Sequence, residues 1–291
     1  MTLRIPAALF LLALACVSCG RREDTAPPVA TASVTLARQQ ASVGSPLEMT
    51  YRFVVAPDAP AFAEDYWVFV HFVDTDRELM WTDDHQPPIP TRQWKPGQTI
   101  EYERTMFVPK FPYTGPTVVE VGLFSRESGR RLPLAGESEG QRSYPVATFD
   151  LQMQNETQFV VFRDGWHPTE ITDDEVGTEW QWSKKEATLT FRNPRRDLLV
   201  YLQLDQPAAL PEPQHVDIRI GDAVVDTFEL RPLQRELRKF AVSGMQLGDG
   251  DTVEMRIIVD RTFVPANVPA LKNSDPRELG VRVFRAYVQP R

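Results

Sequence analysis

The sequence predicts an all-β protein made of two antiparallel β-sandwich domains in tandem, after a lipoprotein signal peptide. Short runs in which apolar and polar residues alternate recur along the chain, and turn residues separate them. The 25 prolines disfavour long helices, because proline removes a backbone donor and clashes inside a helix. A chain of 291 residues is long enough for two domains of ordinary size.

Residues 1–19 have the properties of a secretory signal peptide. Arg4 supplies positive charge near the start, and the apolar run from Ile5 to Val17 is too short to span a bilayer. We therefore expect this segment to direct export and to lie outside the folded domains.

A cysteine ends this segment in a pattern that resembles a bacterial lipobox. Val17 and Ser18 fit the two positions before Cys19, and Gly20 follows it. We expect Cys19 to be acylated, with Cys16 as the alternative acylation site. Cleavage of an ordinary signal peptide beside a cysteine is the other interpretation. Both cysteines of the chain lie here, so the mature domains would have no thiol for catalysis or metal binding.

A flexible tether is expected over residues 20–32. The segment is polar and contains prolines, and a dozen flexible residues reach about 20 Å. Gly20, rather than aspartate, follows the expected acylation site, which resembles lipoproteins that are sent to an outer membrane. We therefore expect a lipid-anchored protein of the cell envelope, at the outer membrane or the cell surface.

The charge balance limits the partners of the protein. Charged residues make up 25% of the chain and the net charge is −8, with short positive clusters such as Arg130–Arg131 scattered along it. Such a chain offers no continuous basic face, so no nucleic-acid partner is expected. No phosphate-binding or dinucleotide-binding glycine motif occurs, and no cofactor is expected.

Residues 33–154 are expected to form an immunoglobulin-like β-sandwich. Apolar and polar residues alternate over residues 47–55, which is typical of a half-buried strand. Residues 66–73 are apolar except His71, which predicts a strand buried on both faces, and the turn residues Asp74–Arg77 follow it. The strands expected in this domain span residues 47–55, 66–73, 78–81, 99–108, 118–125, 131–134 and 144–153.

The motifs of this domain resemble those of a known group of sandwich domains. These motifs are Val68–Asp74, Asp84-His85-x-Pro87, Thr91-x-x-Trp94-x-x-Gly97, and Val121–Phe124 through Gly129-x-Arg131-Leu132. Similar domains lie at the ends of bacterial membrane glycosyltransferases and in related envelope proteins. The resemblance implies a fold and an envelope or polysaccharide setting, and it carries no catalytic residues.

Residues 155–291 are expected to form a second sandwich of the jelly-roll type. Gly221-Asp222 between two alternating runs is a hairpin signal, and the best helical candidate, Pro232–Lys239, is short. The expected strands span residues 159–162, 179–183, 187–191, 198–204, 216–220, 223–230, 238–242, 252–259 and 279–288.

Three motifs of the second domain resemble galactose-binding-like jelly rolls. They are Gly165-Trp166-x-Pro168-x-Glu170, Trp180-x-Trp182 and Asp275–Val281. Some members of this group bind sugars, so the resemblance implies a fold and, for those members, a sugar ligand.

Trp180 and Trp182 are the main candidates for ligand binding. They are two residues apart on one expected strand, so their side chains lie on the same face. Paired indoles are how many carbohydrate-binding modules stack on sugar rings. Trp166 and His167 in the preceding loop would complete the site. The sequence favours the other interpretation, in which both rings pack in the core or between the domains, because a tryptophan buries a large area.

Two other groups of residues could suggest a zinc site or a glycoside hydrolase, but each has a structural interpretation. A zinc set could be drawn from His71, Asp83, Asp84 and His85. His71 lies in an apolar run, however, which favours a buried histidine hydrogen-bonded to a neighbour such as Asp84, so no metal site is expected. Glycoside hydrolysis needs two acids that face each other, whereas one loop holds Glu170, Asp173, Asp174 and Glu175.

These features predict a protein that is not an enzyme, a binding or scaffolding accessory for envelope or extracellular polysaccharide. Its expected partners are the membrane, through the lipid anchor, and polysaccharide or envelope proteins. Two other functions stay open. A structural protein–protein adaptor at the membrane surface would show a large apolar patch, and a glycan-acting hydrolase would show two facing acids in a cleft.

Overall fold

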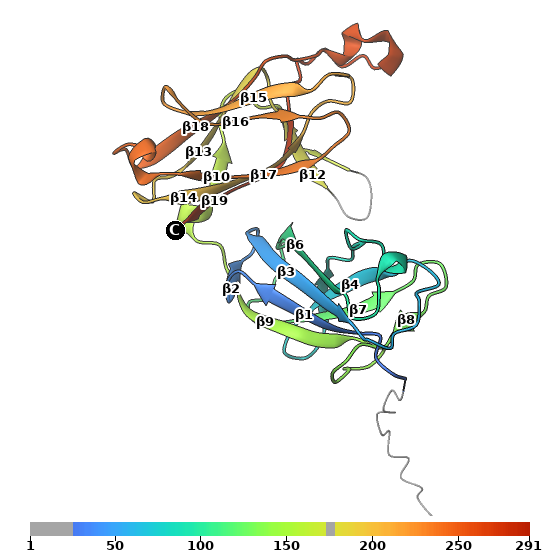
Figure 1. The fold of residues 1–291 in the computed structure, drawn as a ribbon. Coiled ribbons are helices and arrows are strands. Elements are labelled where there is room, and N and C mark those ends of the chain that lie inside the picture. The colour runs from blue at the N-terminus through green and yellow to red at the C-terminus, as the bar shows by residue number, and fades with distance from the viewer. Residues whose placement is uncertain (1–25, 173–177) are drawn as a thin grey trace, which may run out of the picture.

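The computed structural model describes residues 26–172 and 178–291, and in these ranges the chain folds as nineteen β-strands with five short 3-10 turns. No α-helix occurs within the described ranges, and the strands pair almost entirely in antiparallel fashion (Figure 1). The expected signal peptide with Cys16 and Cys19 and residues 20–25 of the expected tether lie outside the described residues. Among the helices that are described, none has the length and apolar character needed to cross a membrane.

Strands β1 to β9 form the N-terminal sandwich, which has two sheets. One sheet has the order β1 (Ala30–Leu36), β3 (Pro46–Val55), β6 (Thr99–Phe107). The other has the order β2 (Gln40–Ser42), β9 (Tyr144–Gln152), β7 (Gly115–Phe124), β4 (Trp67–Val73), β5 (Leu79–Thr82), with β8 (Arg131–Leu132) beside β7. β2 runs parallel to β9, and all other pairs in this sandwich are antiparallel.

The core of this sandwich follows from the alternation seen in the sequence. Tyr51 and Phe53 point inward from β3 and are fully buried, whereas Arg52 between them is exposed. On the facing sheet, Phe72 stacks on Trp81 with ring centroids 4.9 Å apart. Apolar and polar residues that alternate in the sequence therefore point to opposite faces of each sheet, so one face is buried and the other is solvated.

The first strand begins earlier than the sequence indicated. β1 starts at Ala30, and both Val29 and Ala30 are buried, so residues 30–32 belong to the sandwich rather than to the tether. The physical reason is strand pairing, since Ala30 lies opposite Val55 in the antiparallel ladder with β3. The small residues at the start of β1 alternate too weakly for the sequence to reveal this pairing.

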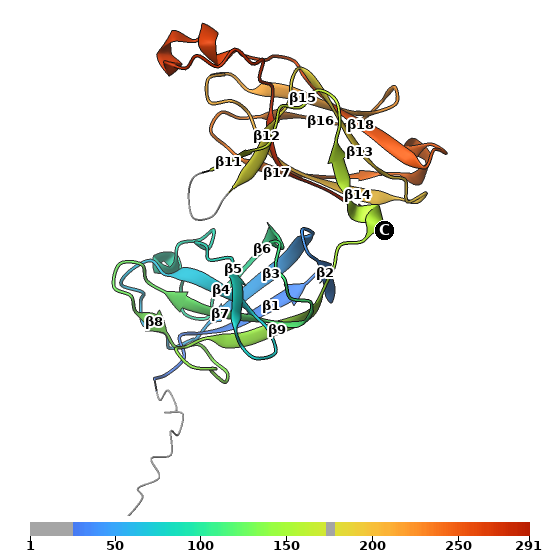
Figure 2. The ribbon, with the colours of Figure 1, turned by 180° about the vertical axis from the view of Figure 1, so that it is seen from behind.

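Strands β10 to β19 form the C-terminal sandwich. One sheet has the order β10 (Val160–Phe162), β13 (Glu186–Arg192), β18 (Thr252–Val259), β15 (Gln214–Ile220), β16 (Ala223–Leu230). The other has the order β11 (Glu170–Ile171), β12 (Glu179–Trp182), β19 (Arg282–Pro290), β14 (Leu198–Asp205), β17 (Glu236–Val242). Figure 2 shows β11 and β12 at the edge of this second sheet, which we call the β12 sheet.

The C-terminal core is built mainly from aliphatic side chains of both sheets. Val200, Leu202 and Leu204 point inward from β14 and are fully buried. The best helical candidate of the sequence, Pro232–Lys239, is a turn followed by the start of β17, because β17 is needed to pair with β14. Tertiary pairing here overrides a weak local preference.

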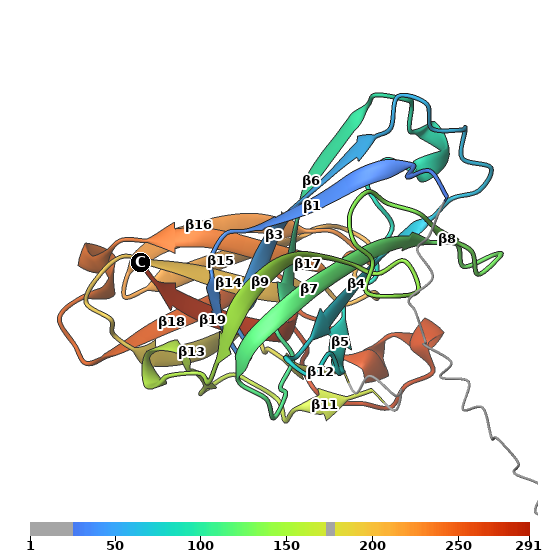
Figure 3. The ribbon, with the colours of Figure 1, turned by 90° about the horizontal axis from the view of Figure 1, so that it is seen from below.

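The two sandwiches contact each other through the outer face of the β12 sheet. Tyr201 of β14 and Tyr287 of β19 form a small buried cluster against Phe107 of β6. The Tyr201 hydroxyl donates a hydrogen bond to Glu48 of β3 at 3.2 Å, and Lys239 of β17 forms an ion pair with the same carboxylate. In the view from below, the N-terminal sandwich lies in front of the C-terminal one, so the two are stacked along the vertical axis of Figure 1 (Figure 3).

Candidate functional site

Strand β12 places Trp180 and Trp182 on one face of the β12 sheet. Its antiparallel pairing with β19 sets Trp182 opposite Arg282. Both indole side chains are half-buried, and neither belongs to the hydrophobic core of the C-terminal sandwich. The two rings thus lie outside the C-terminal core, because the inward positions of this sheet are taken by residues such as Val283. They share the outer face with Tyr201, which contacts the N-terminal sandwich, so the interpretation in which they pack between the domains stays a prediction.

The guanidinium of Arg282 lies among three aromatic rings. Its central carbon is 5.3 Å from the Trp180 ring centroid, 5.4 Å from that of Trp182 and 4.9 Å from that of Phe284. Distances of this size are those of cation–π contacts. Arg282 thus connects the two tryptophans to β19.

Asp205 at the end of β14 fixes the orientation of Arg282. The Nε and Nη2 atoms of Arg282 donate to the two oxygens of Asp205 at 2.9 and 2.7 Å. This is the paired geometry in which a guanidinium and a carboxylate bind most strongly. The Nη1 atom points away from that carboxylate edge, and the described residues provide no hydrogen bond to it.

Arg235, just before β17, also contacts the ring of Phe284. Its guanidinium carbon is 3.5 Å from the ring centroid, and Phe284 is buried. Desolvation lowers the pKa of Arg235, and repulsion from Arg282 and Arg285 adds to this shift while Asp205 opposes it. We call Trp180, Trp182, Arg235, Arg282 and Phe284 the aromatic–arginine face.

A second arginine and carboxylate pair borders this face. The indole nitrogen of Trp180 donates to Glu170 at 3.2 Å, and Glu170 pairs with Arg277 at 2.8 Å. Arg277 also binds Asp275 and, as a hydrogen-bond donor, holds the pKa of that carboxyl below its usual range. The ring of Trp180 is therefore oriented through an acceptor that is itself held in place.

Trp166 and His167 have a different role from the tryptophan pair. The Trp166 ring packs against the C-terminal core and meets Phe162 at 4.7 Å, and its indole nitrogen donates to the carbonyl oxygen of Thr188 at 2.8 Å. His167 Nε2 donates to the carbonyl oxygen of Glu278 at 2.7 Å. Both side chains anchor their loop to the sandwich, which leaves Trp180 and Trp182 as the ligand-binding candidates.

The residues considered for zinc form a hydrogen-bonded network in the N-terminal sandwich. His85 Nδ1 donates to the carbonyl oxygen of Asp83 at 2.8 Å, and its Nε2 accepts from the Tyr102 hydroxyl at 2.8 Å. The Asp83 carboxylate is held by Arg104, and Asp84 accepts from the backbone of Val70. In residues 26–172 and 178–291, no three His, Cys, Asp or Glu side chains are placed to hold a metal ion.

The expectation for His71 is wrong in one respect. His71 is half-buried and lies against the ring of Phe69 at 4.8 Å, whereas the buried histidine is His85. Asp84 bonds to the backbone of β4 rather than to the His71 ring. The reason is that β4 alternates, so His71 points to the face opposite to Val70 and Phe72.

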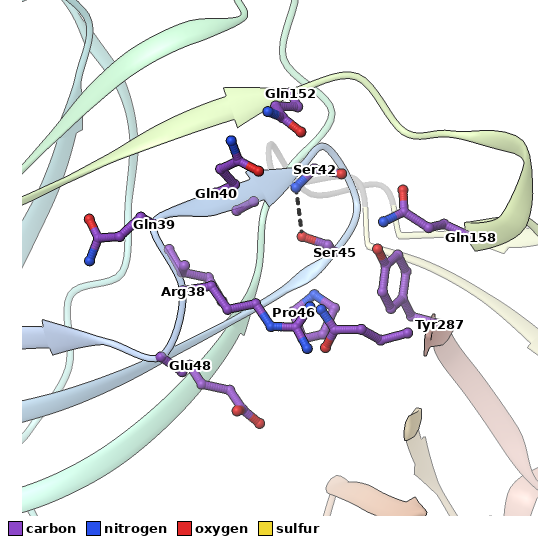
Figure 4. Close-up of a pocket in the computed structure, with 14 residues that line it drawn as sticks. Arg38, Gln39, Gln40, Ser42, Ser45, Pro46, Glu48, Gln152, Gln158 and Tyr287 are labelled. Carbon is purple, nitrogen blue, oxygen red and sulfur yellow. Dashed lines mark hydrogen bonds between the residues drawn. The ribbon is translucent and has the colours of Figure 1, made fainter. Parts of the chain in front are cut away.

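A pocket of about 480 Å³ lies where the two sandwiches meet (Figure 4). Arg38, Glu48 and Tyr287 line it from three different strands or loops. The amide of Gln289 donates to the Tyr201 hydroxyl and accepts from the Arg38 guanidinium. These side chains join the two sandwiches, so the polar lining of the pocket serves the interface.

Sequence reasoning did not find Asp205, Arg235, Arg282 and Phe284. Arg282 and Phe284 alternate within the strand expected at residues 279–288, and that period of two is the signal that placed them on one face. Asp205 and Arg235 lie far from them in the sequence and have no local signal. The acidic residues Asp173, Asp174 and Glu175 lie outside the described residues.

Comparison with known proteins identifies no family. No family model matches the chain, and no curated protein is significantly similar to it. Among the solved structures that show partial likeness are the following three. The alkylpurine DNA glycosylase AlkC of Pseudomonas fluorescens has 14% identity and a TM-score of 0.28, over 43% of this chain and 31% of that one. This chain thus covers about a third of the glycosylase.

The other two are domains of xylan-related proteins. The CBM36-1 domain of a multidomain xylanase from the hindgut metagenome of Trinervitermes trinervoides has 10% identity and a TM-score of 0.26, over 45% of this chain and 94% of that one. The CBM22-1 xylan-binding domain from Paenibacillus barcinonensis Xyn10C has 9% identity and a TM-score of 0.30, over 47% and 88%. Values of this size establish no shared function.

Proposed function

We propose that this protein is a non-catalytic lipoprotein of the cell envelope that binds envelope or extracellular polysaccharide through the aromatic–arginine face. The observation that carries the proposal is the placement of Trp180 and Trp182, which lie on one face of β12, outside the core, with Arg282 between them. A sugar ring presents apolar C–H groups, and an aromatic ring is a surface on which such groups stack.

Arg282 would supply the polar part of this recognition. Asp205 occupies its Nε and Nη2 atoms, so the N–H groups of Nη1 remain to donate to the hydroxyl oxygens of a sugar. Because the carboxylate holds the guanidinium in one orientation, little further entropy is lost when a ligand binds. Stacking and a fixed donor together favour a polyhydroxylated ring over a purely apolar ligand.

The direct test compares the full-length protein with the double variant W180A/W182A in binding to a panel of soluble polysaccharides by affinity electrophoresis. We expect retardation of the wild type by at least one polymer and its loss in the double variant. W67A is the matched control, since Trp67 is a half-buried tryptophan of the N-terminal sandwich with Arg126 over its ring at 3.4 Å. Equal retardation of wild type and double variant would contradict the proposal.

The lipid anchor is the second part of the proposal. Mass spectrometry of the mature protein, purified from membranes, is expected to find a diacylglycerol-modified cysteine at position 19 as the first residue. The variant C19A is expected to lose membrane attachment, while C16A keeps it. Modification at Cys16 instead, or a mature protein that begins beyond Cys19, would overturn this assignment.

An adaptor function is the second candidate, and exposed apolar side chains at the connection between the sandwiches favour it. Met153 and Phe159 are 71% and 51% exposed, and Val161 of β10 is 43% exposed. The double variant M153S/F159S separates the two functions. It would lower recovery of a protein partner in cross-linking but leave polysaccharide binding unchanged.

We do not propose hydrolase chemistry for the aromatic–arginine face. A glycoside hydrolase needs one carboxyl group as acid and a second as base or nucleophile across the substrate. The two carboxylates that contact this face, Asp205 and Glu170, each form an ion pair with an arginine. Both therefore act as anchors of the binding residues in this proposal.

A further inference from the structure

The charges at the aromatic–arginine face are not balanced. Each carboxylate that borders it has a cationic partner: Asp205 pairs with Arg282, Glu170 with Arg277, and Glu179 with Lys110 at 3.8 Å. Arg235 and Arg285, in contrast, have no carboxylate within ion-pair distance among the residues that the structure describes. Within residues 26–172 and 178–291, these two cations have no partner carboxylate at this face, although the whole chain carries a net charge of −8.

Both arginines contact Phe284, the residue whose ring Arg282 also covers. Arg235 lies on Phe284 at 3.5 Å, and Arg282 lies over the same ring at 4.9 Å. Arg285 follows Phe284 directly on β19 and donates from Nη1 to the Phe284 carbonyl oxygen at 3.1 Å. Because the Arg235 guanidinium rests on a ring, its edge N–H groups can bind an oxyanion in paired fashion, and Arg285 adds a second positive charge beside it.

We infer that the aromatic–arginine face selects an acidic polysaccharide, one whose sugar units carry carboxylate or another oxyanion. This inference rests on the proposed function and names its ligand class. Trp180 and Trp182 stack on the sugar rings, Arg282 donates to hydroxyl groups, and Arg235 and Arg285 bind the anionic substituent. A net-negative protein repels an acidic polymer at long range, so binding must come from local contacts of this kind.

The test uses an anionic polymer and a neutral polymer with the same backbone. Polygalacturonate and its fully methyl-esterified form have the same backbone, and titration calorimetry of the full chain measures binding to each. We expect the acidic form to bind about tenfold more tightly or better, with a preference that falls as salt is raised. The variant R235Q/R285Q is expected to lower affinity for the acidic polymer more than affinity for the esterified one, so that the preference is lost.

R126Q is the matched control, because Arg126 also rests on an aromatic ring but lies in the N-terminal sandwich. It is expected to keep the full preference for the acidic polymer. Equal affinity for both polymers in the wild type, or equal losses in R126Q and R235Q/R285Q, would overturn the inference and leave the proposed function standing. If neither polymer binds, dextran sulfate and dextran form a second pair that tests the oxyanion preference on another backbone. No binding to any of the four, together with no retardation in the wider panel, would overturn the proposed function itself.

Discussion

Asp205 and Arg282 lie directly opposite each other on β14 and β19 and are joined by two hydrogen bonds of 2.9 and 2.7 Å. The carboxylate is nearly buried, and the guanidinium reaches from it to the rings of Trp180 and Trp182. One ion pair therefore links the centre of the β12 sheet to the tryptophans at its edge. We therefore expect both the fold stability and the proposed ligand binding to depend on Asp205.

Replacing Asp205 is expected to affect both properties. D205N removes the charge and one strong acceptor, so it should lower the free energy of unfolding by about 1–3 kcal/mol. Without the Asp205 carboxylate, Arg282 is no longer held in one orientation, and the affinity for polysaccharide should fall as well. Urea unfolding and calorimetry measure the two effects. R282K keeps the charge but cannot form the paired geometry, and it should resemble D205N; full binding by R282K would contradict the role given to Arg282.

The three tryptophans of the C-terminal sandwich are expected to divide into a structural one, Trp166, and two that bind the ligand, Trp180 and Trp182. W166A removes a ring that packs on the C-terminal core and should destabilise the protein by about 3–5 kcal/mol. W166F keeps most of the packing but loses the hydrogen bond to Thr188, at a cost of about 1 kcal/mol. W180A should lower the free energy of unfolding less than W166A does, and it should lower the affinity for polysaccharide more than W166A does. Thermal unfolding and affinity electrophoresis on the same samples separate these cases.

Gly165 is expected to tolerate no side chain. It has a φ of +81°, and an added Cβ would overlap the carbonyl oxygen of Glu186 on the neighbouring strand β13. Gly97 has a similar φ of +75° with no atom within 4 Å, so G97A isolates the backbone strain, about 1 kcal/mol. G165A should cost clearly more than G97A in urea unfolding. Equal costs would mean that the loop before Trp166 can move away from β13.

The stability of the protein is expected to fall with acid because of His85. Burial lowers the pKa of His85 below its ordinary value of about 6.5, and Arg104 adds to this. The unfolded chain then binds a proton that the folded chain does not, so stability is complete above pH ~6.5 and is lost as the pH falls below that value. The thermal midpoint should drop between pH 7.5 and pH 5.5.

His71 contributes in the same direction, since burial also lowers its pKa. H85Q should therefore reduce the drop in thermal midpoint, and H71Q/H85Q should reduce it further. A drop that is unchanged in H71Q/H85Q would show that other groups cause the acid sensitivity.

Glu48 is expected to control the contact between the two sandwiches. It accepts from Tyr201 and pairs with Lys239, and burial raises the pKa of Tyr201 so that its hydroxyl stays a donor. E48A should leave each sandwich folded but loosen their contact. The measurements are the maximum dimension in small-angle scattering and the rate of proteolysis between residues 152 and 160, both of which should rise. E101A, at an exposed ion pair with Arg52, is the control.

Much of the fold could be read from the sequence because its strands alternate. The run at residues 47–55 and the apolar run at 66–73 correspond closely to β3 and β4, where one or both faces are buried. The start of β1 at Ala30 could not be found in this way, since small residues there pair with β3 without a clear period. The domain boundaries and the immunoglobulin-like and jelly-roll assignments stay predictions.

The sequence by itself determined that Trp180 and Trp182 share a face, because residues two apart on a strand point the same way. It also determined the all-β architecture, through its alternation and its prolines. Only the tertiary structure decided that this face is the outer one, and that Asp205 and Arg235 meet Arg282 there. Those contacts join residues that are far apart along the chain, and no local pattern encodes which side of a sheet the neighbouring strands will cover.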